Sequence, residues 1–136
     1  MTTDNLITST EGELRELAAD LIAVRDGECL LCYVYRMLEF GCTGFRWAGH
    51  YRDVRAPRAT GLERRLGRIG GFCDCEIFMN AYQPILAAWT PGSTVVDERG
   101  SEEIIEPEWP EQMPTCGGAR PGSTRPCSLW VRVPRW

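Results

Sequence analysis

The chain has 136 residues, of which 43% are hydrophobic and 25% are charged, and its formal net charge is −4. This length suits one domain, or a smaller domain with a tail, and the composition excludes a chain that is disordered or collagen-like throughout. No apolar run approaches the roughly 18 residues of a membrane-spanning helix, and the first residues lack the basic and apolar regions of a secretion signal. We therefore expect a soluble cytoplasmic protein with no membrane partner.

The first 84 residues carry the periodicity of helices. Thr10 and Glu13 form a capping box in front of leucines at helical spacing, and Thr60 and Glu63 repeat this pattern. The run from Leu30 to Phe40 is mostly apolar and ends at Gly41, and its composition indicates a buried helix. The expected helices cover residues 11–25, 30–40, 60–69 and 74–82. The stretch at 42–57 is expected to be irregular.

The chain changes character after Pro84, since eight of the nine prolines lie at or beyond that position. Short β-like runs follow, at residues 94–96, 104–105 and 129–133, separated by Gly, Pro and Ser. Seven acidic residues against one arginine occur between Asp97 and Glu111. We therefore expect a helical metal-binding domain over residues 1–84 and an acidic, Pro/Gly-rich C-terminal arm over residues 85–136.

Seven cysteines in a chain with one histidine and no export signal point to a metal site or to redox chemistry. Cys29 and Cys32 form a Cys-x2-Cys pair, and Cys73 and Cys75 form a Cys-x-Cys pair. Both pairs fall at expected helix N-termini, where free backbone N–H groups favour thiolates. Four thiolates are the ligand set of structural zinc, and an iron–sulfur cluster is the alternative.

The sequence therefore predicts zinc bound by Cys29, Cys32, Cys73 and Cys75, with Cys42 as an alternative ligand. The fold class predicted is mainly α, a small domain of about four helices clipped by zinc, with a Pro-rich C-terminal extension that contains short β-like segments. The remaining cysteines, Cys116 and Cys127, lie in a stretch with the composition of a mobile tail. Cys73→Ser is accordingly expected to lower the melting temperature more than Cys127→Ser.

Residues 70–77 read Gly-Gly-Phe-Cys-Asp-Cys-Glu-Ile, and Asn80 follows. This run resembles the Gly-Gly-aromatic-Cys-Asp-Cys-Glu signature of a family of small bacterial proteins known only as a domain of unknown function. The segment from Cys42 to Arg46 is similar to the family's preceding Cys-Asp-His-Thr-Leu-Arg-like segment, and the resemblance covers residues 29–82. It implies a ligand set and no activity. Where many members place His, this chain has Gly44, and the upstream Cys-x2-Cys pair is a source of replacement ligands.

Basic and aromatic side chains are interleaved between the second and third expected helices. This is the composition that stacks bases and holds phosphates, and it also suits cation–π packing on a solvated surface. The net negative charge of the whole chain weakens nonspecific binding of nucleic acid. The candidate binding residues are Arg46, Trp47, Tyr51, Arg52, Arg55 and Arg58.

These patterns favour a zinc-binding, non-enzymatic protein-interaction or regulatory module. Four cysteines fill a tetrahedral shell and leave no position for a catalytic water, and the chain has no phosphate loop, zincin helix or nucleophile elbow. The expected partner is another protein, and a homodimer is open. One alternative is a nucleic-acid or ribosome-associated factor that uses the Arg/aromatic surface. Another is a thiol-based redox or metal sensor.

Overall fold

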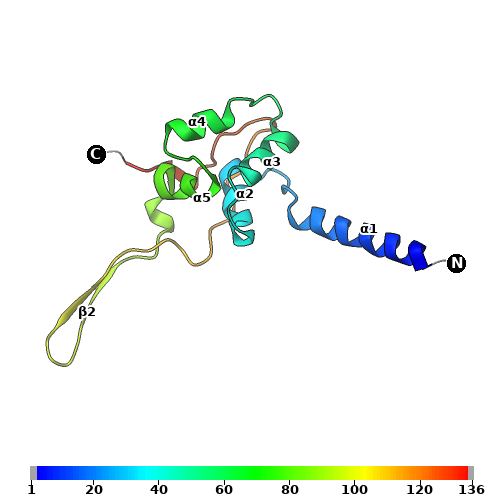
Figure 1. The fold of residues 1–136 in the computed structure, drawn as a ribbon. Coiled ribbons are helices and arrows are strands. Elements are labelled where there is room, and N and C mark those ends of the chain that lie inside the picture. Colours follow the sequence, from blue (N-terminus) through cyan, green and yellow to red (C-terminus); the bar gives the residue numbers. More distant parts are fainter. Residues whose placement is uncertain (1–2, 135–136) are drawn as a thin grey trace.

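The computed structural model describes the backbone of residues 3–134 and the side chains of residues 10–134, with five α-helices and four strands in this range (Figure 1). The helices are α1 (Thr3–Leu21), α2 (Leu30–Met37), α3 (Arg46–Arg55), α4 (Leu62–Arg68) and α5 (Asp74–Glu76). The strands are β1 (Tyr82–Pro84), β2 (Ser93–Val96), β3 (Glu102–Ile105) and β4 (Trp130–Arg132). Strand β1 pairs antiparallel with β4, and β2 pairs antiparallel with β3.

The prediction of a mainly α fold is wrong, because the described chain is a mixed α/β domain and not a zinc-clipped assembly of four helices. The helix expected from residue 74 to residue 82 is replaced by the short α5 and a π turn at Ile77–Ala81. The chain then becomes extended as β1, because a residue that precedes a proline disfavours the helical region. The β-like runs in the second half form β2, β3 and β4, as the sequence predicts.

Helix α3 lies in the stretch that the sequence analysis expects to be irregular. It has no side-chain cap from its own N-cap residue, Phe45. The cap comes instead from Asp74, whose carboxylate accepts hydrogen bonds from the backbone N–H groups of Trp47 (2.9 Å) and Ala48 (3.1 Å). Because this partner is 27 residues away in the chain, no local start signal marks the helix.

The hydrophobic core gathers α2, α3, α4 and the segment after Ile77 around large side chains. Trp47, Tyr51 and Tyr33 are almost fully buried. Residues from the far end of the chain share this core, since Leu129 and Trp130 are 5% and 4% exposed. The expected division at residue 84 thus falls at the end of β1, and both sides of it contribute to one core.

Two elements project away from this core in Figure 1: helix α1 and the hairpin of β2 and β3. Leu14, Leu17 and Leu21 of α1 are each 60% exposed. All residues of β2 and β3 are exposed as well. Among residues 3–134, no helix combines the length and the apolar character needed to cross a lipid bilayer.

Candidate metal centres

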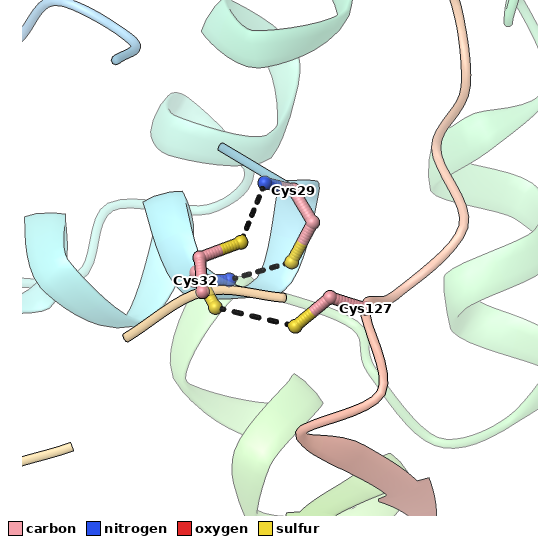
Figure 2. A group of neighbouring side chains, drawn as sticks. Cys29, Cys32 and Cys127 are labelled. Carbon is pink, nitrogen blue, oxygen red and sulfur yellow. Dashed lines mark hydrogen bonds between the residues drawn. The ribbon is translucent and has the colours of Figure 1, made fainter. Parts of the chain in front are cut away.

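Four cysteines from distant parts of the chain meet at the start of α2. Cys29 is the N-cap of α2, and Cys32 lies in its first turn. Cys116 and Cys127 approach from the C-terminal segment, and all four sulfurs lie within 4.8 Å of one another. Figure 2 shows Cys29, Cys32 and Cys127 of this group, with 3.7 Å between the sulfurs of Cys32 and Cys127. A tetrahedral zinc ion with Zn–S distances near 2.3 Å separates its sulfurs by about 3.8 Å, so the spacing fits this ion.

Hydrogen-bond donors surround these sulfurs. The backbone N–H of Cys32 donates to Cys29 Sγ (3.4 Å), and the backbone N–H of Cys29 donates to Cys116 Sγ (3.3 Å). Gly118 N–H donates to Cys116 Sγ, and Trp130 Nε1–H donates to Cys32 Sγ, both at 3.3 Å. Donors of this kind stabilise negative charge on sulfur, and metal ligation requires the thiolate form.

Hydrogen bonding and burial shift the pKa values of three cysteines in this group. Hydrogen bonding from the Cys32 side chain lowers the pKa of Cys29 to about 5, against the opposing effect of burial. The same hydrogen bond and burial raise the pKa of Cys32, and burial raises the pKa of Cys127. Without a metal ion, Cys29 is thus favoured as a thiolate beside the protonated thiols of Cys32 and Cys127. A bound dication replaces the remaining protons, so binding releases protons.

The two C-terminal cysteines approach each other beside Gly117, where there is little room for a side chain. A Cβ atom at Gly117 would lie 2.7 Å from Ser128 Oγ and 3.5 Å from Cys127 Cβ. The first distance is shorter than van der Waals contact allows, so a side chain at position 117 would require the Ser128 hydroxyl to turn away. The segment between them is held as well, because Ala119 N–H donates to Gly27 O at 2.8 Å.

The other three cysteines form a second group about the start of α5. Cys73 is the N-cap of α5, Cys75 lies in its first turn, and Cys42 lies in the loop before α3. Their sulfurs all lie within 4.8 Å of one another, with 3.3 Å between Cys73 and Cys75. Cys75 N–H donates to Cys42 Sγ at 3.4 Å. Cys42 is exposed, and the other two side chains are partly exposed.

Hydrogen bonding also divides the protons in this second group. Burial raises the pKa of Cys73, but hydrogen bonds from the backbone of Glu76 and from the Cys75 and Cys42 side chains outweigh it, so the pKa is lowered. The hydrogen bond with Cys73, together with one from Cys42, raises the pKa of Cys75 to about 12. A metal ion bound here would likewise displace protons from sulfur.

The two carboxylates next to these cysteines serve the backbone. Both oxygens of Asp74, which is fully buried, accept hydrogen bonds from the start of α3. Glu76 Oε2 accepts a hydrogen bond from Phe72 N–H at 3.1 Å. Asp74 therefore caps α3, and Glu76 binds the backbone in front of α5.

The structure divides the predicted ligands between the two groups. Cys29 and Cys32 do start a helix, as do Cys73 and Cys75, but each pair has different partners. Cys42, the alternative ligand, joins Cys73 and Cys75. His50 belongs to neither group and lies against the ring of Tyr33, with 6.2 Å between ring centroids.

Sequence reasoning missed Cys116 and Cys127 as partners of the first pair. The contacts that bring them there span 87 and 95 residues. Spacing along a chain does not encode which distant pairs meet, just as it does not encode disulfide connectivity. The expected mobile tail is also not what the structure shows at Cys127, which is 6% exposed. The only signal in the sequence is the presence of two cysteines in the C-terminal half to which the predicted site gives no role.

The structure buries both aromatic residues of the predicted Arg/aromatic surface. Trp47 and Tyr51 are 1% and 2% exposed, so their rings cannot stack on a ligand. The guanidinium of Arg46 covers the Trp47 ring at 4.4 Å. Arg52 pairs with Asp53 and Glu63, and Arg55 donates to Val24 O. Arg58 is exposed. The cation–π and ion-pair contacts are those of a solvated helix face.

Comparison with known proteins adds one match. Residues 30–80 match the model of a family described as a protein of unknown function (DUF2695). The matched segment contains the whole three-cysteine group, but only Cys32 of the four-cysteine group. No curated protein and no solved structure matches the chain.

Proposed function

We propose that this protein is a zinc-stabilised, non-enzymatic module that binds another protein. The observation that carries the zinc site is the four-cysteine group, whose sulfurs lie within 4.8 Å of one another among N–H donors. Four thiolates are the set that closes a structural zinc site, and the cysteines of such a site tie distant segments together. Zinc bound here would hold the C-terminal segment to the start of α2.

A structural role for this metal is supported by the filled ligand set. Catalytic zinc keeps a position open for water or substrate, and four protein thiolates leave none. The single histidine of the sequence lies against Tyr33 and apart from the cysteine groups, so it offers no imidazole base to a thiol. These features favour a metal ion that stabilises the fold over one that takes part in catalysis.

Elemental analysis tests the zinc site directly. Protein purified under reducing conditions without chelators should retain about one zinc per chain after passage over a weak chelating resin. Cys116→Ser should lose this retained zinc, whereas Cys42→Ser, in the other group, should keep it. Iron with visible absorption in place of zinc, or retained zinc that Cys116→Ser leaves unchanged, would overturn the assignment.

The protein-binding role rests on α1. Its exposed leucines repeat at helical spacing on one side, and its exposed charges between Glu11 and Asp20 comprise four acids against Arg15. An apolar stripe with acidic flanks is complementary to a protein surface that is apolar with basic flanks. We infer that the partner protein carries such a surface.

Two synthetic amphipathic helices test this partner chemistry. They carry the same leucine stripe, one with lysine flanks and the other with glutamate flanks. The lysine-flanked peptide should bind the protein, more weakly as salt is added, and Leu17→Glu should abolish binding. Equal binding of the two peptides, or no binding of either, would contradict the proposal. Leu86→Glu, which changes an exposed leucine outside α1, is the matched control.

Nucleic-acid binding through the Arg/aromatic surface has less support. Its aromatic rings are buried, and two of its arginines are engaged in ion pairs. Affinity would then depend on phosphate contacts alone, which the net charge of −4 opposes.

A further inference from the structure

We propose that Cys42, Cys73 and Cys75 form a second metal site of a different kind, with three thiolate ligands and one open coordination position that accepts a small-molecule thiol. This site goes beyond the proposed zinc-stabilised module, because it uses none of the four cysteines that close the first site. The metal class is that of soft or borderline ions that prefer sulfur, with zinc as the first candidate.

The three sulfurs are held in place by the fold. Asp74, between Cys73 and Cys75, is anchored on both sides: its carboxylate caps α3 and its backbone N–H donates to Gly44 O at 2.9 Å. The second contact fixes the loop that carries Cys42 against α5. Cys75 N–H then donates to Cys42 Sγ. Three thiols from two segments are thus preorganised by contacts that do not need a metal.

The two carboxylates next to these cysteines in the chain already accept hydrogen bonds from the backbone. Both oxygens of Asp74 accept hydrogen bonds from α3, and Glu76 accepts one from Phe72 N–H. His50 is not part of the group. Zinc favours four ligands, so an ion held by these three thiolates would complete its shell from solvent.

The surroundings leave that position accessible. Cys42 and its neighbour Thr43 are exposed, and Phe72, the residue before Cys73, is 69% exposed. The four-cysteine group differs, because Cys29 is 0% and Cys127 is 6% exposed. An open, solvent-facing site exchanges its ion by stepwise ligand replacement, whereas a closed and buried site must first lose a ligand. The two sites should therefore differ in exchange rate and in their response to an added thiol.

The coordination chemistry balances without an oxidant or a reductant. Three thiols each release the proton that they still hold as they bind the ion, and water fills the fourth position. An added thiol that takes this position displaces the water and releases its own proton. The ion keeps its oxidation state throughout.

Cobalt(II) titration of metal-free protein tests the site, since cobalt reports its sulfur ligands by absorption. Under anaerobic conditions without added thiol, the protein should bind about two cobalt ions per chain. Glutathione should then change the spectrum of one of them towards that of a four-sulfur site. Cys42→Ser should bind about one ion and lose the response to glutathione. Cys116→Ser should keep that response.

Zinc exchange supplies the second readout. A chromogenic zinc chelator should remove zinc from wild-type protein in a fast and a slow phase. Cys42→Ser should lose the fast phase alone, and Cys116→Ser the slow phase alone. The control Thr43→Ala, at the exposed position next to Cys42, should retain both phases. A Cys42→Ser variant that binds as many ions as the wild type, a fast phase that this variant retains, or a spectrum that glutathione leaves unchanged would each overturn the second site.

A failure of the second site can be told apart from a failure of the first. Loss of the fast phase and of the glutathione response concerns only Cys42, Cys73 and Cys75. Loss of the slow phase concerns only the four-cysteine group. Circular dichroism of Cys42→Ser confirms that the variant is folded, which the exposure of this side chain leads us to expect.

Discussion

Asp74 serves two structural purposes from one position in the chain. Its carboxylate satisfies two N–H groups at the start of α3, and its backbone N–H binds the loop at Gly44. The side chain is fully buried, so burial raises its pKa even though the two N–H donors favour the charged form. The acidic residue between Cys73 and Cys75 thus couples the second cysteine group to the core helix.

Asp74→Ala should therefore destabilise the fold by about 2 kcal/mol or more, because it leaves two buried donors of α3 unpaired. Denaturant unfolding of metal-free protein isolates this effect from any loss of metal. Glu76→Ala removes one hydrogen bond at an exposed site and should cost less than about 1 kcal/mol. Equal costs for the two variants would show that Asp74 does not cap α3.

At the scale of elements, local pattern and long-range contact account for different parts of the fold. The sequence predicts α2, α4 and the strands β2, β3 and β4, because propensity and turn residues mark them locally. It misses α3, whose cap is supplied by Asp74, and it misses the π turn, which ends a helix that periodicity alone would continue. It also expects both cysteine pairs at helix starts, where Cys29 and Cys73 are the N-caps, but it joins the two pairs in one site, whereas the structure places them in separate groups. The local sequence pattern does not reveal contacts between residues that are far apart in the chain.

Strand β4 shows how such contacts anchor the C-terminal segment. Trp130 contacts the rings of Tyr35, Phe78 and Trp109, with centroid distances of 5.7, 5.1 and 6.1 Å. Its indole N–H donates to Cys32 Sγ. One side chain thus joins the aromatic cluster to the four-cysteine group.

Trp130→Ala should lower the free energy of unfolding by about 3–5 kcal/mol, the range for truncating a buried aromatic side chain. Its neighbour Val131 lies on the same strand but is 41% exposed, so Val131→Ala should cost less than about 1 kcal/mol. Urea unfolding followed by tryptophan fluorescence and by circular dichroism measures both. If the two variants were equally stable, the C-terminal segment would be an appendage to the core and not a part of it.

Across the whole molecule, the seven cysteines of the sequence divide completely into the group of four and the group of three. In the group of four, Cys32 and Cys127 are 95 positions apart in the chain, and in the group of three, Cys42 and Cys75 are 33 positions apart. Closing the longer span removes more freedom from the unfolded chain. The buried group should therefore contribute more to stability when metal is bound.

This reverses the order that the sequence alone suggests for two serine variants. Cys127→Ser should lower the melting temperature of zinc-loaded protein more than Cys73→Ser, because it opens the closed site and places a hydroxyl where the side chain is 6% exposed. Cys73→Ser removes a ligand from a site that is already open to solvent. The difference between the variants should shrink after chelation, when neither site holds metal, leaving only the cost of the buried hydroxyl. Calorimetry with and without chelator measures both differences. A larger effect of Cys73→Ser in zinc, or a difference that chelation leaves unchanged, would show that metal at the four-cysteine group does not hold the C-terminal segment in place.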